Sequence, residues 1–300
     1  MLSILIPTYN YDCTQLVLEL QRQATSASID YEIIVADDAS PMDKYKKVNR
    51  TVNSLPHCRF IELDTNVGRA RIRNLLADEA QGEWLLFMDC DAEVINKEFI
   101  TNYLSHTDAE VICGGLRHAD ELPSTEVSLR YIYEKRADKH RAACYRTRRP
   151  YEHFTPFNFM IRHTTFQSIR FDERLTEYGH EDTLFGIALS KKRANIRHID
   201  NALLHTGLES NETFLKKTRA ALNNLSTMEQ AMQGHSALLR AYNLLRTIGL
   251  SHHFGRWFAR KEQVLTYRLM SSTPSLYLFF VYKLGYYCHL RQGGQDVPRN

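Results

Sequence analysis

The chain has 300 residues, of which 43% are hydrophobic and 24% are charged, and this balance is typical of a globular protein. A chain of this length can bury a sizeable core, and it predicts one large domain or one domain with an appendage. The formal net charge of +3 is too small to indicate binding of nucleic acid, and we expect no nucleic-acid partner.

The six cysteines are widely scattered and include no C-x-x-C pair and no spacing typical of zinc ligands. They are expected to be reduced thiols of an intracellular protein. The N-terminal residues lack the basic segment of a secretory signal. The nearest approach to a membrane span, Leu276 to Leu284, is short and contains Lys283. We therefore expect a cytoplasmic protein.

The first half of the chain alternates between two apolar patterns. Short apolar runs predict strands at 2–6, 33–36, 59–63, 84–88 and 111–113. Helical patterns lie between them, at 12–24, 44–52, 68–80 and 97–104. This alternation predicts an α/β fold with a Rossmann-like, mostly parallel sheet, right-handed crossovers and helices on both faces. In such a sheet, ligands bind at the edge formed by the carboxyl ends of the strands.

Two carboxylates stand at the carboxyl end of the strand at 84–88. Its five consecutive apolar residues predict a strand buried on both faces, and Asp89-Cys90-Asp91 follows directly. A pair of carboxylates at this edge suits a hard divalent cation that keeps positions open for water and phosphate oxygens. We interpret Asp91 as a metal ligand and Asp89 as a partner of the metal's water or of a ribose. A solvated turn is the alternative, because Asp-x-Asp is a weak pattern.

Three other strand ends carry groups that would meet at the same edge. They are Pro7-Thr8-Tyr9-Asn10, Asp37-Asp38-Ala39-Ser40, and 66–74 with Gly68 at a helix start and arginines at 69, 71 and 73. Together with the two carboxylates, they are the kinds of group that bind a base, a ribose and a diphosphate. The structural alternatives are a helix N-cap for the two aspartates, a plain turn for Gly68 and a solvated helix face for the arginines.

At this point the chain resembles a known family. Residues 3–10 and 32–40, Asn66 to Gly68 with Arg73-Asn74, and Asp89-Cys90-Asp91 are similar to the successive motifs of family 2 inverting glycosyltransferases, which have the GT-A fold. The resemblance extends over about residues 2–206 and rests on four motifs in order. It implies a nucleotide-sugar donor, most simply a UDP-sugar, and a divalent cation, Mn²⁺ or Mg²⁺.

The resemblance also implies roles for single residues. The implied nucleotide-binding residues are Pro7, Tyr9, Asp38, Gly68, Arg73 and Asp89. Pro7 and Tyr9 would line the base pocket, and Asp38 would accept a hydrogen bond from the base. The sequence Ala39-Ser40-Pro41-Met42 replaces the family's usual glycine-serine-threonine turn, which leaves the ribose contacts there open.

The second half of the chain offers a candidate base. A glycine at 179 and apolar residues at 184, 187 and 188 predict that Glu181-Asp182 lies at a helix N-terminus, where capping is the structural alternative. The pair resembles the family's Glu-Asp motif. This implies that Asp182 deprotonates the acceptor hydroxyl and that Glu181 orients the acceptor or the base. One base without a carboxylate nucleophile also separates this chemistry from a retaining mechanism.

Two further features lie on either side of this pair. His205 closes a short apolar run, and its place about 23 residues after the Glu-Asp pair matches the family's late histidine. The match implies a metal ligand in addition to Asp91 and Asp89. Between 130 and 149 the chain holds eight basic residues against Glu134 and Asp138. This segment is either an exposed helix and loop or a mobile flap that holds the diphosphate or an anionic acceptor.

The resemblance ends near residue 211. Helical patterns and an aromatic, basic segment at 257–290 predict a helical C-terminal appendage of 211–300. It would follow a catalytic domain of 1–210, with a nucleotide half of about 1–115 and an acceptor half of about 116–210. Packing onto the catalytic domain is the default role of the helices. A basic, aromatic-rich amphipathic end could instead make peripheral contact with the inner membrane face, where lipid-linked acceptors would be found.

The sequence thus predicts a metal-dependent inverting glycosyltransferase that uses a glycan or lipid-linked acceptor in polysaccharide or glycolipid synthesis. Two other classes compete with it. A sugar-phosphate nucleotidylyltransferase would carry a glycine-rich Arg/Lys loop where Pro7-Thr8-Tyr9-Asn10 stands. A non-catalytic module that binds nucleotides or sugars would tolerate loss of the base, whereas Glu181 and Asp182 are both present.

Overall fold

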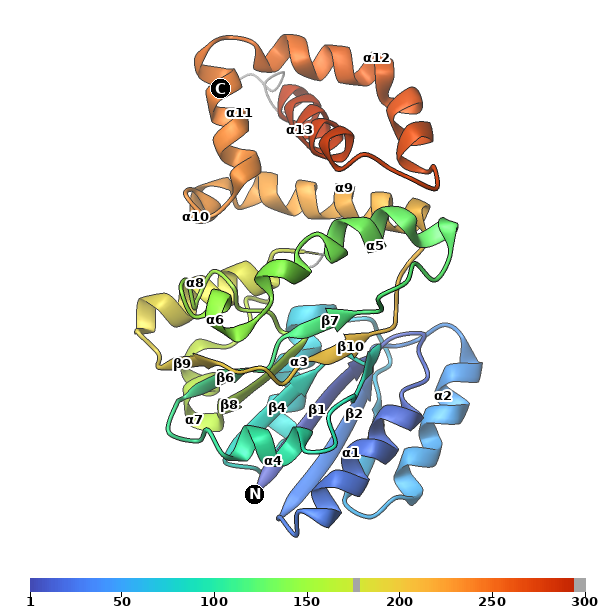
Figure 1. Cartoon of the computed structure of the whole chain (residues 1–300), viewed down its shortest axis with the longest axis vertical. Helices are drawn as coiled ribbons and strands as arrows, with labels where there is room; N and C mark the ends of the chain where they lie inside the picture. The colour runs from blue at the N-terminus through green and yellow to red at the C-terminus, as the bar shows by residue number, and fades with distance from the viewer. Residues whose placement is uncertain (175–178, 294–300) are drawn as a thin grey trace. The chain divides into compact units, whose positions relative to one another are not determined.

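The structure is a computed structural model that describes residues 1–174 and 179–293 (Figure 1). These residues form two compact units. The sheet unit consists of 1–119, 138–174 and 181–207, and the helical unit consists of 120–137, 179–180 and 208–293. The division expected at residue 210 differs from these units in one main respect. Residues 120–137 group with the C-terminal helices, because Leu129 belongs to the apolar core of the helical unit.

The sheet unit is organised around a sheet whose strands follow the order β3-β2-β1-β4-β8-β6-β9. These strands are β1 (Leu2–Thr8), β2 (Tyr31–Asp37), β3 (Cys58–Glu62), β4 (Trp84–Met88), β6 (Val111–Cys113), β8 (Asn158–Arg162) and β9 (Ile196–His198). β8 runs antiparallel to β4 and β6, and the other neighbours are parallel. The predicted α/β fold with a mostly parallel sheet is therefore confirmed.

Both faces of this sheet are buried, because successive side chains of a strand point to opposite faces. On β4, Leu86 and Met88 belong to one apolar core, whereas Leu85 and Phe87 belong to the other. The helices that close the first core are α1 (Thr14–Ser26) and α4 (Phe99–Leu104), and those that close the second are α3 (Arg69–Glu79), α7 (His163–Ile169) and α8 (Glu181–Lys192). The helices thus cover β4 on both sides, as its apolar run predicts (Figure 1).

Short elements complete the sheet unit. The helical ones are α2 (Asp43–Asn49), η1 (Arg50–Ser54), η3 (Asp138–His140) and α6 (Ala143–Arg146). A second, small sheet has the order β5-β10-β7 and consists of β5 (Ala92–Glu93), β10 (Leu203–His205) and β7 (Leu116–His118). β10 is antiparallel to β5 and parallel to β7. This pairing brings the chain around residue 205 next to the loop that follows β4.

The helical unit contains η2 (Thr125–Val127), α5 (Ser128–Lys135), α9 (Asn211–Thr227), α10 (Glu229–Met232), α11 (Ala237–Thr247), α12 (Ser251–Leu269) and α13 (Leu276–Gly293). Its apolar core includes Phe214 of α9, Phe258 of α12 and Tyr282 of α13. α12 and α13 approach closely at Gly285, where an added Cβ would lie 2.6 Å from the Phe258 ring. The predicted helical C-terminal region is confirmed. Within the part of the chain that is described, none of the helices combines the length and apolar character that crossing a bilayer requires.

Candidate active site

The loops after β1 and β4 meet where the order of the strands reverses. β1 lies between β2 and β4 in the sheet. After β1 the chain adds β2 and β3 on one side of it, and then returns to add β4 on the other side. In an open α/β sheet, such a switch point forms a crevice outside the carboxyl ends of the strands, where ligands bind. Asp89 follows β4 directly, and its backbone N–H donates to the Phe157 carbonyl at 3.2 Å. The predicted acidic loop therefore begins at the edge of the sheet where binding is expected.

Asp89 forms a largely buried ion pair with Arg73. Nη2 of Arg73 donates to Oδ1 of Asp89 at 2.5 Å, and Arg73 is only 2% exposed. Burial by itself would raise the pKa of Asp89, but the charges of Arg73 and Arg69 outweigh it and hold the pKa below its ordinary value. Arg73 also donates to the Arg69 carbonyl at 3.1 Å. Arg73 thus fixes the direction of Asp89, and its own contact with a nucleotide stays a prediction.

Asp91 and His205 face each other although 114 positions separate them in the sequence. Nε2 of His205 lies 3.1 Å from Oδ2 of Asp91. In the small sheet, His205 is paired in register with Ala92, the residue after Asp91. Thr206 donates from its N–H and from its hydroxyl to the Asp91 carbonyl, each at 2.9 Å. Two of the three predicted metal ligands are therefore brought together by strand pairing.

The surroundings of this pair leave little room for movement. The His205 ring lies 5.3 Å from the Phe157 ring and 5.6 Å from the His118 ring, measured between centroids, and its side chain is 7% exposed. On the other side, a Cβ added at Gly207 would lie 2.3 Å from Oδ2 of Asp91. Only glycine leaves the Asp91 carboxylate in this position.

Asp38 joins the loops after β2 and β3. Its two carboxylate oxygens accept from the N–H groups of Val67 at 2.7 Å and Gly68 at 3.0 Å. Gly68 has a φ of +84°, which favours glycine, and it precedes the first residue of α3. Burial raises the pKa of Asp38, although the two amide hydrogen bonds lower it. Asp38 thus positions the start of α3, and its contact with a base stays a prediction.

Pro7 and Tyr9 lie at the end of β1. Pro7 is partly buried, and Tyr9 is 50% exposed. The next residue, Asn10, is tied to the loop after β2, because its N–H donates to Oγ of Ser40 at 2.7 Å and its Oδ1 accepts from the N–H of Met42 at 3.2 Å. The structure therefore presents an exposed aromatic ring beside the switch point, where the sequence predicts the base pocket.

Glu181 and Asp182 begin α8, as predicted. Glu181 is 7% exposed, and its Oε1 lies 3.6 Å from Nη1 of Arg69. Oδ1 of Asp182 accepts from the N–H of Thr183 at 2.6 Å and from its hydroxyl at 3.2 Å. Because the charge of Arg69 also acts on Asp89, this arginine lies close to Glu181 of α8 and to the acidic loop after β4.

Three residues of this region, Arg69, Tyr11 and Thr206, have no role that the sequence alone assigns. The signal for Arg69 is present, since arginines at 69, 71 and 73 cannot all point one way on a helix. The structure separates them: Arg73 is buried, Arg69 is directed to Glu181, and the Arg71 side chain is 58% exposed. Tyr11 carries no motif. Its hydroxyl lies 3.1 Å from Oγ1 of Thr206, and burial, opposed by that hydrogen bond but aided by the charge of Asp91, raises its pKa.

The basic segment at 130–149 is divided between the two units. In the helical unit, Arg130 pairs with Glu134 and Glu209. In the sheet unit, Arg146 is 5% exposed. Its guanidinium donates to the ring of His198 and to four backbone carbonyls, those of Cys113, Gly114, Arg141 and Ile199. Arg146 therefore has a structural role, whereas Arg148 is exposed.

The fold is that of solved glycosyltransferases. The chain superposes with a TM-score of 0.55 on the mannosyltransferase PcManGT from Pyrobaculum calidifontis, solved with GDP-Man and Mn²⁺, at 13% identity over 99% of this chain and 88% of that one. It superposes with a TM-score of 0.50 on residues 1–349 of Staphylococcus aureus TarS in complex with UDP-GlcNAc, at 18% identity over 98% and 91% of the two chains. These superpositions show that the chain has the GT-A fold.

The family follows from the sequence. The model of glycosyl transferase family 2 matches residues 3–176, which is more than half of the chain, and the chain belongs to this family. The predicted family is confirmed. This family does not support the alternative of a nucleotidylyltransferase, and it does not test the alternative of a module that only binds.

Two curated relatives match smaller parts. The poly(ribitol-phosphate) beta-N-acetylglucosaminyltransferase TarS of Staphylococcus aureus is 32% identical over 109 residues, which are 35% of this chain and 18% of TarS. The chondroitin synthase of Escherichia coli is 25% identical over 243 residues, which are 68% of this chain and 34% of the synthase. This chain therefore spans about a third or less of the length of these relatives.

Proposed function

We propose that the protein transfers a sugar with inversion from a nucleotide-diphosphate donor to a hydroxyl of a glycan or lipid-linked acceptor, in polysaccharide or glycolipid synthesis. The observation that carries the proposal is the position of Arg69. Its guanidinium lies 3.6 Å from Glu181, and its charge acts on Asp89. An inverting transfer needs the leaving diphosphate on one side of the sugar and a base on the other, and Arg69 lies within reach of both acidic groups.

The donor is proposed to be a UDP-sugar. A structure of TarS holds UDP-GlcNAc, whereas PcManGT holds GDP-Man, so a GDP-sugar is the alternative. Pro7 and Tyr9 would line the base pocket beside Asp38. The diphosphate would lie against the N-terminus of α3 at Gly68, where backbone N–H groups and the helix dipole favour an anion.

The residues present fit a divalent cation, Mn²⁺ or Mg²⁺. Oδ2 of Asp91 and Nε2 of His205 lie 3.1 Å apart, and a set of carboxylate and imidazole donors suits Mn²⁺. Asp91 and His205 would hold the ion, and Asp89 would join them through the oxygen that Arg73 does not engage or through a water. When bound, the ion neutralises charge that develops on the leaving diphosphate.

The remaining steps are assigned to side chains of α3 and α8. Arg69, whose side chain is 45% exposed, would add a positive charge at the diphosphate, and Arg73 would hold Asp89 in place. Asp182 would accept the proton of the acceptor hydroxyl as its oxygen attacks the anomeric carbon. Thr183 sets the direction of the Asp182 carboxylate through two hydrogen bonds, and Glu181, next to Arg69, would orient the acceptor.

The cytoplasm is the proposed compartment. All six cysteines are free thiols, which suits a reducing environment.

The test combines a donor screen with one substitution. Hydrolysis of UDP- and GDP-sugars is measured with Mn²⁺, with Mg²⁺ and with a chelator, and transfer is then measured for Asp182→Asn. We expect Asp182→Asn to bind donor as the wild type does and to lose transfer about 10²- to 10⁴-fold, the usual contribution of a general base. Asp30→Asn is the matched control, because Asp30 is exposed and precedes β2, at the opposite edge of the sheet.

Two results would contradict the proposal. Wild-type transfer by Asp182→Asn would show that Asp182 is not the general base, and full activity in the chelator would show that the reaction does not need a metal ion. A loss of transfer in Asp30→Asn as large as that in Asp182→Asn would show that the effect is not specific to α8.

A further inference from the structure

Positive charge is concentrated near the C-terminal end of the chain. Residues 234–293 contain eight Lys and Arg residues and a single acidic residue, Glu262. The formal net charge of the whole chain is only +3. The helical unit therefore carries an excess of positive charge that the composition of the whole chain conceals.

On α12 the basic residues lie on the face opposite to the core. This helix has 19 residues, or about 28 Å at 1.5 Å per residue. Its buried residues, Gly255, Phe258, Leu265 and Leu269, lie on one side at helical spacing. The exposed residues of the opposite side, which we call the α12 face, are Arg256, Trp257, Arg260, Lys261, Val264, Tyr267 and Arg268.

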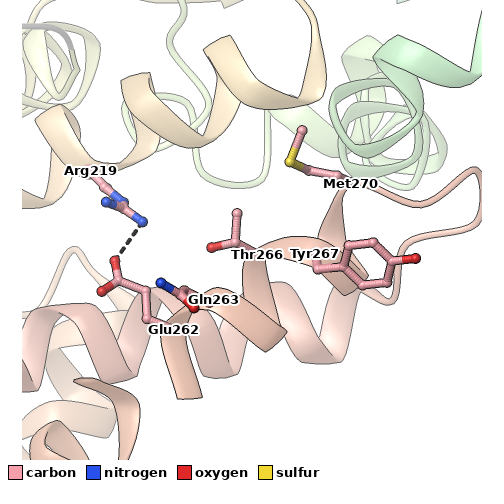
Figure 2. A pocket seen from close by; sticks show the side chains of 6 residues that line it. All are labelled: Arg219, Glu262, Gln263, Thr266, Tyr267 and Met270. Carbon is pink, nitrogen blue, oxygen red and sulfur yellow. Dashed lines mark ion pairs between the residues drawn. The ribbon is translucent and has the colours of Figure 1, made fainter. Parts of the chain in front are cut away.

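The charge of the α12 face is not compensated by acidic side chains. Glu262 is turned away from this face and pairs with Arg219 of α9 (Figure 2). Within the residues described, no acidic side chain forms an ion pair with Arg256, Arg260, Lys261 or Arg268. Repulsion among these four cations costs some stability, and an anionic partner would offset that cost.

The same face exposes apolar and aromatic surface between the cations. Trp257 is 39% exposed, Val264 is 50% exposed and Tyr267 is 81% exposed. Beside Tyr267 a hollow of about 460 Å³ lies between α9 and α12, lined by Arg219, Glu262, Gln263, Thr266, Tyr267 and Met270 (Figure 2). Just before α12, Ile248 and Leu250 are also exposed, at 56% and 48%. A purely polar anion would leave this apolar surface uncovered.

We propose that the α12 face binds the surface of a bilayer that contains anionic phospholipid. Lys and Arg side chains attract anionic headgroups, and Trp and Tyr prefer the boundary between headgroups and acyl chains. Both kinds of residue alternate along one exposed helix, which would lie in the plane of the interface. The inference goes beyond the proposed transfer reaction and does not depend on it.

The test is sedimentation of the full chain with lipid vesicles, without donor or metal. We expect binding to vesicles of phosphatidylcholine and phosphatidylglycerol in equal parts, weaker binding at high salt, and none to phosphatidylcholine alone. Trp257 provides a second readout, because insertion shifts its fluorescence to the blue, whereas Trp84 is already buried.

Two matched variants distinguish binding by the α12 face from attraction by the positive charge of the chain in general. Arg256→Gln/Arg260→Gln/Lys261→Gln is expected to bind the anionic vesicles about a hundredfold more weakly, since each cation near an anionic leaflet contributes about a factor of five. Lys44→Gln/Lys191→Gln/Lys192→Gln removes the same charge from exposed positions of the sheet unit and is expected to bind as the wild type does. Circular dichroism checks that both variants are folded.

Three outcomes would overturn the inference. They are no binding of the wild type to anionic vesicles, equal weakening in both variants, and binding to a single-stranded oligonucleotide that anionic vesicles do not displace. Because none of these measurements requires sugar transfer, a failure here leaves the proposed reaction untouched, and a failure of the transfer assay leaves this surface untouched.

Discussion

Replacing Arg146 by methionine tests whether one buried guanidinium stabilises the part of the sheet unit around β6 and β9. The acceptors of this guanidinium lie at 2.9 Å (Cys113 O), 3.2 Å (Gly114 O), 2.7 Å (Arg141 O), 2.6 Å (Ile199 O) and 2.7 Å (His198 Nδ1). Methionine fills part of the same volume but leaves four carbonyls and one ring nitrogen without this donor. Several of these groups are buried, and water cannot replace the donor for all of them.

The magnitude follows from these contacts. A hydrogen bond contributes about 1 kcal/mol net, and a buried acceptor left without a donor costs about 1 to 3 kcal/mol. Relief of the cost of burying a charge offsets part of this loss. We therefore expect Arg146→Met to lower the free energy of unfolding by about 3 to 5 kcal/mol.

The assay is unfolding in urea, monitored by circular dichroism. Arg148→Met is the matched control, because Arg148 is exposed and its guanidinium lies 4.8 Å from the Tyr145 ring centroid. The control is expected to change the free energy of unfolding by less than about 0.5 kcal/mol, as is usual for surface substitutions. If Arg146→Met stays within about 1 kcal/mol of the wild type, the network does not stabilise the fold as argued.

Two further predictions concern His198 and Gly207. Burial lowers the pKa of His198 to about 4, although a hydrogen bond from its Nε2–H to the Pro150 carbonyl raises it, and the unfolded chain binds this proton near pH 6.5. Stability is thus lost as the pH falls from about 6.5 to about 4, and we expect His198 to contribute a loss of about 2 kcal/mol between pH 7 and pH 5. Urea unfolding at both pH values should show a difference of this size between the wild type and His198→Gln, and parallel curves would refute it. Gly207→Ala places a Cβ 2.3 Å from Oδ2 of Asp91 and must displace that carboxylate. We expect a loss of metal-dependent donor affinity of about tenfold or more, measured by calorimetry with and without Mn²⁺, and an unchanged affinity would show that Asp91 does not hold the metal.

Much of the sheet could be predicted from local pattern. A run such as Trp84 to Met88 identifies a strand buried on both faces, because each side chain has its own apolar core to enter. The direction of β8 could not be predicted, since the same apolar run fits a parallel or an antiparallel neighbour. The sequence does not predict the small sheet either, because a strand of two residues, such as β5, is too short to show an alternation of apolar and polar side chains.

The candidate site likewise has features that the sequence determines and features that only the tertiary structure decides. The sequence alone determined that Pro7, Asp38, Gly68 and Asp89 would lie at one edge, because the carboxyl ends of parallel strands share it. The resemblance implies that His205 joins Asp91 at a metal, but only the tertiary structure shows how the two meet, because β10 pairs with β5 across more than a hundred residues. Likewise, the orientation of α3 against the sheet decides which arginine reaches Glu181, and helical spacing by itself cannot fix that rotation.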